Sequence, residues 1–360
     1  MKAAVLHQVG ETKLDIRDDV GVIDVGPTDV RVRIRATGVC HSDLSAMNGT
    51  LPQMVPAVLG HEGAGEVVEV GSLVTDVQVG DHVIVCWLPP CGSCRYCLGA
   101  QPYLCTVYVM HSFVAPNFTL EGKPVFGMAG TGTFAEEVVL PRPGVVTIPA
   151  DVPFDVASLI GCGVMTGVGA VINSAKVEPG STVLVVGAGG VGISVIQGAR
   201  IAGAAEIVAV DMVDQKLTWA KEFGATHAVT PDDLPGVIAE LTAGEGFDYG
   251  FEVVGRAQTI RSTYDATRRG GTTVVVGAGR ADDQVQFTAF ELLFLEKTIK
   301  GALYGGADIR RDYHRLIALW RNGRLDLERM ITRRISLDDV NGAFDAMQSG
   351  EVIRQVVEIG

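Results

Sequence analysis

Four cysteines lie within fifteen residues and have the spacing of a metal site. The run Cys91-Gly-Ser-Cys94-Arg-Tyr-Cys97 is followed, after seven more residues, by Cys105. Four thiolates this close can surround one tetrahedral ion, and Zn²⁺ takes this donor set in structural sites, which leave no position for a substrate. A bacterial ferredoxin run would instead place its fourth cysteine after three residues and follow it with proline, whereas Thr106 follows here. The spacing predicts a closed zinc site.

A second set of candidate metal ligands is dispersed along the chain and comprises Cys40, His61 and Cys162; Cys86 is the remaining cysteine. Two cysteines and one histidine form the ligand set of a catalytic zinc, with one position left for water or substrate. Spacing alone does not establish this site, because more than a hundred residues separate the first ligand from the last. Each residue by itself also fits an ordinary core position.

A glycine-rich turn follows a predicted buried strand at 181–186. The turn, Gly187-Ala-Gly-Gly-Val-Gly192, has the G-x-G-x-x-G pattern and precedes a helix-compatible segment at 193–202. In this context the glycines let the backbone approach a pyrophosphate, which the N-terminus of the helix attracts. Asp211 ends the next apolar run and is placed to accept hydrogen bonds from the adenosine ribose. Because an acid repels a 2′-phosphate and Met212 follows it, we predict NAD rather than NADP.

Two patterns of secondary structure must position these residues. Before about residue 149, short β-type runs alternate with turns, which predicts an antiparallel, barrel-like region with strands at 30–34, 65–70 and 81–85. Further on, apolar runs alternate with helical stretches, which predicts βαβ units and a parallel sheet with strands at 182–186, 207–210 and 272–276. A helix is also predicted at 312–321, before Asn322-Gly323.

Composition narrows the class of protein. A chain of 360 residues suggests two domains, and 47% hydrophobic with 20% charged residues is ordinary for a globular protein. The net charge of −13 argues against a nucleic-acid partner. We expect a cytoplasmic protein without a membrane span, because no signal core is visible at the N-terminus and the most apolar stretch, 182–205, is broken by glycines and polar residues.

Several motifs occur in the order typical of the zinc-dependent medium-chain alcohol dehydrogenases, and the chain resembles this family over essentially its whole length. The motifs are Gly-Val-Cys-His-Ser-Asp at 38–43, Gly-His-Glu-Gly-Ala-Gly at 60–65, the four-cysteine lobe at 91–105, Gly-Cys-Gly at 161–163 and the glycine turn at 187–192. The resemblance implies an α/β plus β fold: a Rossmann doubly wound parallel sheet with a GroES-like, largely antiparallel β catalytic domain. It implies that residues 1–163 and 304–360 form the GroES-like domain and that 164–303 form the Rossmann domain.

The same resemblance implies an NAD-dependent enzyme with two zinc ions per chain. Cys91, Cys94, Cys97 and Cys105 match the structural zinc ligands, while Cys40, His61 and Cys162 match the catalytic ones, with Glu62 as a transient ligand. Asp43 matches the acid that orients His61, and Ser42 the hydroxyl that takes the alcohol proton. Many members carry a histidine where this chain has Ser45, so the proton route beyond Ser42 stays open between water and His41.

For the cofactor, the resemblance implies contacts from the glycine turn and from residues outside it. Lys216 matches a ribose-contacting lysine, Arg354 a pyrophosphate-pairing arginine and His41 a second phosphate-facing residue; on composition alone, Lys216 and Arg354 would be surface charges. The full predicted set is His41, Gly187, Ala188, Gly189, Gly190, Val191, Gly192, Asp211, Lys216, Val276, Gly277, Ala278 and Arg354.

The substrate pocket implied by position is apolar throughout and comprises Leu51, Trp87, Leu104, Met110, Met128, Ala129, Ala278 and Leu303. It predicts reversible oxidation of hydrophobic primary alcohols to aldehydes, with Trp87 excluding many secondary alcohols. Leu51 and Val109 argue against a glutathione adduct, whose charges they would leave unpaired. The alternatives are a thiol-adduct (formaldehyde-type) dehydrogenase and a nicotinoprotein with permanently held NAD.

Further expectations concern assembly and rival classes. The segment from Cys105 to about Phe134 resembles that of the longer, liver-type branch, which implies a homodimer, with a homotetramer as the alternative. A zinc-ribbon module that binds partners or nucleic acid would need neither the dinucleotide turn nor the acidity of the chain. A zinc-free quinone-reductase-like relative would lack the ligands Cys40, His61 and Cys162.

Overall fold

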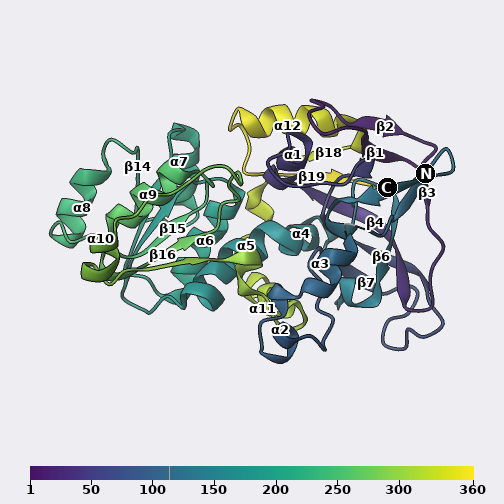
Figure 1. Cartoon of the computed structure of the whole chain (residues 1–360), viewed down its shortest axis with the longest axis horizontal. Coiled ribbons are helices and arrows are strands. Elements are labelled where there is room, and N and C mark those ends of the chain that lie inside the picture. The colour runs from purple at the N-terminus through teal and green to yellow at the C-terminus, as the bar shows by residue number, and fades with distance from the viewer. Residues whose placement is uncertain (113) are drawn as a thin grey trace. The chain divides into compact units, whose positions relative to one another are not determined.

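The computed structural model describes residues 1–112 and 114–360 and contains two compact units (Figure 1). The first unit comprises Met1–Gly163, Asp308–Gly323 and Leu327–Gly360, and the second comprises Val164–Ala307 and Arg324–Asp326. Both ends of the chain therefore belong to the first unit, and the second is inserted between them. The predicted domain boundaries, between residues 163 and 164 and between residues 303 and 304, stay a prediction.

The first unit contains two β-sheets. One has the order β2-β1-β5-β9-β8-β3, with the strands β1 (Ala3–Leu6), β2 (Asp15–Arg17), β3 (Gly21–Val22), β5 (Ala57–Val58), β8 (Phe118–Leu120) and β9 (Lys123–Gly127). The other has the order β11-β7-β6-β4-β19-β18, with β10 beside β4, and comprises β4 (Asp29–Val39), β6 (Glu62–Val70), β7 (His82–Val85), β10 (Glu137–Pro141), β11 (Val145–Ile148), β18 (Ile331–Ile335) and β19 (Arg354–Glu358). All pairs are antiparallel except β5 with β9 and β18 with β19.

The strand β19, from the C-terminal end of the chain, pairs with β4 from the N-terminal part, with Val356 opposite Gly38. This pairing builds the C-terminal segment into the sheet of the first unit. Short helices complete the unit: α1 (His41–Met47), α2 (Arg95–Leu98), α3 (Thr106–Ser112), α4 (Phe154–Leu159), α11 (Ile309–Arg321) and α12 (Val340–Gln348), with single 3-10 turns at Pro102–Leu104, Met128–Gly130, Arg142–Gly144, Glu328–Met330 and Leu337–Asp339.

The second unit is built on one parallel sheet of order β14-β13-β12-β15-β16-β17. Numbered within the unit this order is 3-2-1-4-5-6, that of a dinucleotide-binding doubly wound fold. Its strands are β12 (Thr182–Val186), β13 (Glu206–Val210), β14 (His227–Val229), β15 (Phe247–Glu252), β16 (Thr267–Val275) and β17 (Thr298–Gly301). Its helices are α5 (Met165–Gly169), α6 (Gly190–Ala202), α7 (Asp214–Glu222), α8 (Leu234–Thr242), α9 (Ala257–Ala266) and α10 (Ala289–Phe294), with a 3-10 turn at Leu303–Gly306.

The predicted parallel sheet and antiparallel β region are confirmed, and the differences lie at element ends. The strand predicted at 65–70 begins three residues earlier, at Glu62, because a run of small residues pairs with β4. The helix predicted at 312–321 begins at Ile309, since Asp308 precedes it and the Asp312 carboxylate accepts the backbone N–H of Asp308 at 2.9 Å. These extensions depend on contacts outside the local pattern.

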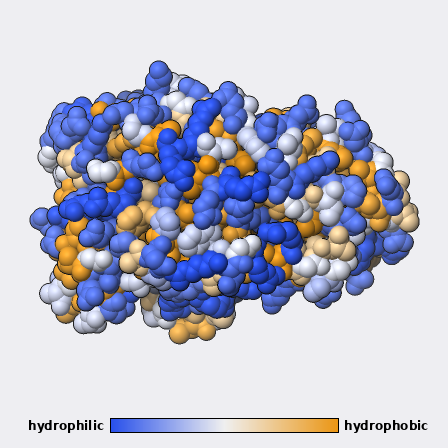
Figure 2. Space-filling model, turned by 180° about the vertical axis from the view of Figure 1, so that it is seen from behind, coloured by the Kyte–Doolittle hydropathy of each residue, from blue (hydrophilic) through white to orange (hydrophobic). Residues whose placement is uncertain are grey.

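Within the described part of the chain, one helical run, Phe154–Ala175, is long and apolar enough to cross a membrane. In the molecule, 83% of its most apolar window is buried, which is typical of a core helix. It joins α4, the wider turns Ile160–Val164 and Ala170–Ala175, and α5. The face drawn in Figure 2 mixes hydrophilic residues with smaller groups of hydrophobic ones, as protein surfaces normally do.

Candidate active site

The four clustered cysteines meet around one point, as their spacing predicts. Their four sulfurs lie within 4.8 Å of one another. The Sγ of Cys97 is 3.9 Å from that of Cys91 and 3.5 Å from that of Cys94. A tetrahedral ion with four sulfurs at about 2.3 Å places those sulfurs about 3.8 Å apart. The cluster therefore has the dimensions of a closed zinc–thiolate site.

Backbone groups prepare part of this cluster for a metal ion. Hydrogen bonds from the backbone of Ser93 and Cys94 lower the pKa of the Cys91 thiol to about 6, which favours its thiolate form. Burial, together with the neighbouring thiols Cys94 and Cys105, raises the pKa of Cys97 to about 12. Cys91 therefore favours the thiolate form that binds metal, whereas Cys97 keeps its proton until a cation binds. Metal binding at this cluster therefore releases protons.

The dispersed candidates also meet, although they are far apart in the sequence. Cys40 directly follows β4, His61 directly precedes β6, and Cys162 lies in the wide helical turn Ile160–Val164. The ligand atoms of these three residues and of Glu62 lie within 4.8 Å of one another, and all four side chains are buried. Two sulfurs, one imidazole nitrogen and a nearby carboxylate match the donor chemistry of a catalytic zinc with an exchangeable position.

Asp43 connects three parts of this group through its carboxylate. Its Oδ1 lies 3.2 Å from Nδ1 of His61 and accepts the backbone N–H of Gly60 at 3.0 Å, while its Oδ2 accepts the backbone N–H of Cys40 at 2.9 Å. The carboxylate is completely buried. It fixes the imidazole so that Nε2, a buried atom with no hydrogen-bond partner among the described residues, is left for a metal ion.

Electrostatics within the group favour a bound cation. Burial opposes the charged form of His61, but Asp43 and Cys40 outweigh it and raise the pKa of the imidazole to about 10. The hydrogen bond with Cys162 lowers the pKa of the Cys40 thiol well below its usual range, although burial opposes this. Negative charge is therefore stabilised at the Cys40 sulfur, and a zinc ion in place of the His61 proton would balance it.

Glu62 forms a buried ion pair that the sequence did not indicate. Its Oε2 accepts from Nη2 of Arg354, the first residue of β19, and its Oε1 accepts the backbone N–H of Gly163 at 3.2 Å. Gly38 makes room for the pair, since a Cβ there would lie 3.0 Å from Nη2 of Arg354. Arg354 is thus engaged beside the candidate metal site, and its expected contact with a pyrophosphate stays a prediction.

Other predicted residues lie close to the group. Ser42, in the first turn of α1, has its hydroxyl 3.7 Å from Sγ of Cys40. The ring of Trp87 stands edge-on to that of His61, with the centroids 6.4 Å apart. His41 is exposed at the start of α1. Ser42 and Trp87 are therefore near the candidate ligands, and the role of His41 stays a prediction.

The remaining predicted pocket residues are not all alike. Leu51, Leu104 and Ala129 are half-buried in the first unit, and Met128 lies in its hydrophobic core. Met110 on α3 is exposed, as are Ala278 and Leu303 of the second unit. Their joint contribution to a substrate pocket stays a prediction.

The glycine turn lies at the carboxyl end of β12 and leads into α6, as predicted. Gly187 has a φ of +99°, and a Cβ on Gly192 would lie 1.9 Å from the carbonyl oxygen of Gly187. Asp211, at the end of β13, accepts the backbone N–H of Ala188 at 2.9 Å, and Nζ of Lys216 lies 4.0 Å from its carboxylate. The predicted ribose acid is therefore connected directly to the predicted phosphate turn.

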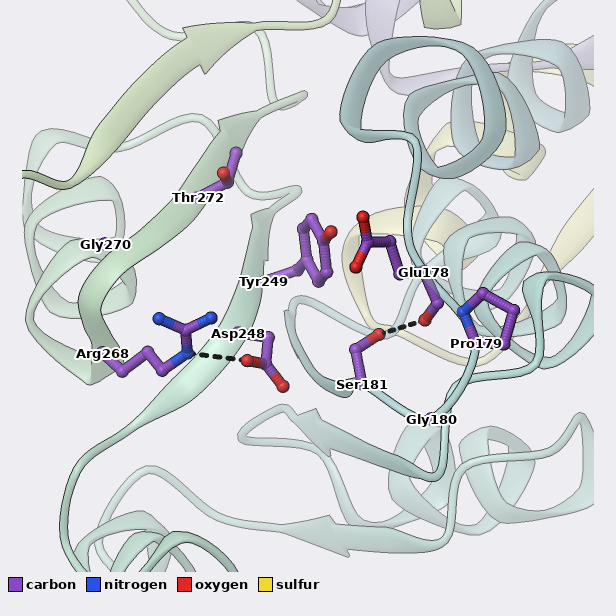
Figure 3. Close-up of a pocket in the computed structure, with 9 residues that line it drawn as sticks. All are labelled: Glu178, Pro179, Gly180, Ser181, Asp248, Tyr249, Arg268, Gly270 and Thr272. Atoms are coloured by element: carbon purple, nitrogen blue, oxygen red, sulfur yellow. Dashed lines mark hydrogen bonds and ion pairs between the residues drawn. The ribbon is translucent and has the colours of Figure 1, made fainter.

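A polar cavity of about 280 Å³ opens at the opposite edge of the same sheet (Figure 3). It lies at the amino ends of β12 and β15, beside the first half of β16, whereas ligands of open parallel sheets bind at the carboxyl ends. Asp248 accepts from Nε of Arg268 at 2.7 Å and from the backbone N–H of Thr182 at 2.8 Å. These partners satisfy Asp248 structurally, and the cavity holds none of the predicted site residues.

The two units together define a class: a dinucleotide-dependent dehydrogenase with a GroES-like β domain and a zinc-binding cysteine and histidine site. Family comparisons agree, because "Alcohol dehydrogenase GroES-like domain" matches residues 26–150 and "Zinc-binding dehydrogenase" matches residues 190–322. The chain belongs to the zinc-dependent medium-chain alcohol dehydrogenases, and it is an NAD-dependent zinc enzyme that acts on small molecules.

Three relatives illustrate the range of the family. The S-(hydroxymethyl)glutathione dehydrogenase of Paracoccus denitrificans is 40% identical over 91% of this chain and 92% of its own length. The crystal structure of benzyl alcohol dehydrogenase from Acinetobacter calcoaceticus is 31% identical, with a TM-score of 0.92 over 100% of this chain and 99% of that one. A zinc-binding dehydrogenase of Sinorhizobium meliloti bound to NADP is 29% identical, with a TM-score of 0.81 over 99% and 98%.

Proposed function

We propose that this enzyme catalyses the reversible oxidation of hydrophobic primary alcohols, aliphatic or aromatic, to aldehydes, with hydride transfer to NAD⁺. The observation that carries the proposal is the buried group of Cys40, His61 and Cys162, in which His61 Nε2 has no partner among the described residues. A closed structural site would need a fourth permanent ligand. Here the fourth side chain, Glu62, is held by Arg354, which leaves a position for the alcohol.

Each residue of the group has a separate task. The zinc, when bound, polarises the alcohol oxygen and lowers the pKa of its hydroxyl. Asp43 keeps the imidazole of His61 in one tautomer and one orientation. The Ser42 hydroxyl, near Cys40, takes the alcohol proton as it passes its own proton onward, to water or to His41. Cys91, Cys94, Cys97 and Cys105 hold the second, structural zinc.

Trp87 beside the group of Cys40, His61 and Cys162, together with the apolar residues predicted to line the pocket, supports a hydrophobic substrate. Trp87 stands beside His61, and its bulk limits the space for a second substituent on the carbinol carbon. Leu51 and Val109 offer no charge to a peptide-like substrate, and an unpaired carboxylate against apolar groups is costly. The neighbour that acts on benzyl alcohol agrees with this preference.

A second candidate is the oxidation of a thiol adduct, which the name of the Paracoccus relative favours. That relative is more similar in sequence than the benzyl alcohol enzyme, but the activity in its name requires recognition of a glutathione adduct. A nicotinoprotein that retains NAD through purification is the other alternative. A thiol-adduct dehydrogenase would be most active with the adduct, and a nicotinoprotein would turn over without added NAD⁺, so a panel of substrates distinguishes both from the first candidate.

The decisive experiment compares benzyl alcohol, 1-hexanol, 2-hexanol and S-(hydroxymethyl)glutathione with added NAD⁺, followed by the absorbance of NADH. We expect the two primary alcohols to give the highest kcat/KM. Replacement of Trp87 by alanine should raise kcat/KM for 2-hexanol at least about tenfold, because it removes the bulk beside His61.

The matched control is Trp320→Ala, which alters a half-buried tryptophan on α11, outside the metal group. Higher activity with the glutathione adduct than with either primary alcohol would contradict the proposed substrate class. Turnover by protein that needs no added NAD⁺ would identify the nicotinoprotein alternative. Unchanged use of 2-hexanol by the Trp87 variant would show that this ring does not limit the substrate.

The exposed edge of the parallel sheet supports a homodimer. All four residues of β17 are exposed at this edge, and α10 presents Phe290 and Leu293, which are 70% and 74% exposed. An unpaired edge strand beside apolar side chains is a surface that natural proteins normally cover. A second copy of the chain supplies an identical edge, and two such edges complement each other through a twofold axis.

Leu293→Glu is expected to convert most of the dimer to monomer, because it adds a charge to the apolar surface of α10. Light scattering during size-exclusion chromatography measures the mass directly. Leu73→Glu is the matched control, since Leu73 is 69% exposed in the first unit. A tetrameric wild type, or a Leu293 variant that remains dimeric, would contradict this interface.

Cysteine chemistry supports a cytoplasmic location. All seven cysteines are free thiols, and two of their groupings match zinc sites rather than disulfides. Such thiols persist in reducing compartments.

A further inference from the structure

Glu252 is a buried carboxylate that belongs to neither metal group and to no predicted contact with the cofactor. It is the last residue of β15 and is completely inaccessible to solvent. Its Oε1 accepts three hydrogen bonds: from the backbone N–H of Val254 at 2.9 Å, from that of Gly255 at 2.7 Å and from the hydroxyl of Thr259 at 2.6 Å. Its Oε2 has no hydrogen-bond partner in the described part of the chain. The side chain thus fastens the loop that follows its own strand.

Backbone hydrogen bonds of Glu252 and Val253 connect this loop to the segment after β16 and to the residue before the glycine turn. The carbonyl oxygen of Glu252 accepts the N–H groups of Val276 at 2.8 Å and Gly277 at 3.0 Å, at the end of β16. The N–H of Val253 donates to the carbonyl of Val186, the last residue before the glycine turn. All three loops lie at the carboxyl edge of the parallel sheet, where dinucleotides bind.

These loops lie close together at glycines that leave no room for a Cβ. A Cβ on Gly187 would lie 2.9 Å from Cγ2 of Val254, and a Cβ on Gly277 would lie 2.2 Å from the backbone nitrogen of Gly255. A Cβ on Gly255 would lie 2.7 Å from the carbonyl carbon of Ala278. A shift of the Val254–Gly255 backbone must therefore move the glycine turn or the segment at 277–278.

We propose that Glu252 is a positioning residue for NAD: by holding the loop at 253–255, it sets the relative positions of the glycine turn and the Gly277–Ala278 segment. It does not touch the cofactor. The inference rests on the NAD dependence of the enzyme and adds a residue that the dinucleotide motif does not contain. Misplacement of a binding group by about 1 Å can reduce an enzyme's efficiency about a hundredfold.

The test compares full-length, zinc-loaded Glu252→Ala, Glu252→Gln and Thr259→Val with the wild type. Alanine removes all three hydrogen bonds, so we expect the KM for NAD⁺ and the Kd for NADH, measured by fluorescence titration, to rise about 10- to 100-fold. The kcat at saturating NAD⁺ should change less than about threefold, because the metal group is untouched. Glutamine keeps an oxygen for the same three donors and should remain within about threefold of the wild type.

Thr259→Val removes one of the three donors to Glu252 and should raise the KM for NAD⁺ about threefold to tenfold. This milder variant serves as the test if the alanine variant does not fold. Glu240→Ala, on the exposed side of α8, is the matched control. Variants that lower thermal stability or kcat while KM and the NADH Kd stay at wild-type values would overturn the positioning role. So would a glutamine variant as weak as the alanine variant. Failure of the wild type to bind NADH would instead contradict NAD dependence.

Discussion

The Cys162→Ala protein is expected to retain one zinc ion per chain instead of two and to lose alcohol oxidation by at least about a thousandfold. The expectation follows from the buried group of Cys40, His61, Glu62 and Cys162, because only two of its three permanent ligands would remain. Loss of the metal removes several kcal/mol of charge stabilisation at the alcohol oxygen, and about 4 kcal/mol corresponds to a thousandfold in rate.

The measurement combines zinc analysis of the dialysed protein with steady-state kinetics. Cys86→Ala is the matched control, because Cys86 is also buried in the same unit but belongs to neither metal group. The control should keep two zinc ions and activity of the wild-type order. A Cys162 variant with two zinc ions and full turnover would show that the catalytic site lies elsewhere.

The two metal groups differ in how far the sequence predicts them, and the reason is their distance along the chain. The four cysteines at 91–105 are close in the sequence, so the short chain between them keeps their sulfurs near one another. Their spacing therefore indicates a metal site without any family comparison. Cys40 and His61 come together only because the strands beside them, β4 and β6, pair with each other. Cys162 joins them because the turn Ile160–Val164 lies next to these strand ends. Residue types suggested this site, and only family resemblance assigned it.

The ion pair of Glu62 and Arg354 has no local signal at all. The two residues are 292 positions apart, and they meet because β19 pairs with the strand that also pairs with β6. Glu252 is equally inconspicuous, since a single acid at the end of an apolar strand fits a solvated turn. Glu62 and Arg354 are found by structure because their partners come from distant elements, and Glu252 because its local partners do not reveal that its carboxylate is buried. The parallel sheet and the glycine turn, by contrast, follow from periodicity and composition.

Replacing Asp211 by asparagine is expected to reduce the preference for NAD over NADP, expressed as the ratio of kcat/KM values, about 10- to 100-fold. Asp211 directly follows β13, and its side chain is 12% exposed. Its Oδ2 accepts the N–H of Ala188 at 2.9 Å, and its Oδ1 accepts that of Val213 at 3.1 Å. Asparagine removes the charge that repels a 2′-phosphate. Its single amide oxygen can still accept the N–H of Ala188, but the second acceptor, which binds the N–H of Val213, is lost. It also leaves Lys216 without a nearby anion, so the lysine becomes available to a phosphate.

The asparagine variant preserves more of the local structure than alanine would, because alanine frees both the N–H of Ala188 inside the glycine turn and the N–H of Val213. Initial rates with NAD⁺ and NADP⁺ at several concentrations give the ratio. The matched control, Asp214→Asn, changes an exposed aspartate three residues further on, at the start of α7. If the ratio falls in the Asp211 variant and not in the control, nucleotide choice is set by this one buried charge. An unchanged ratio would mean that the shape of the β13–α7 loop excludes the 2′-phosphate instead.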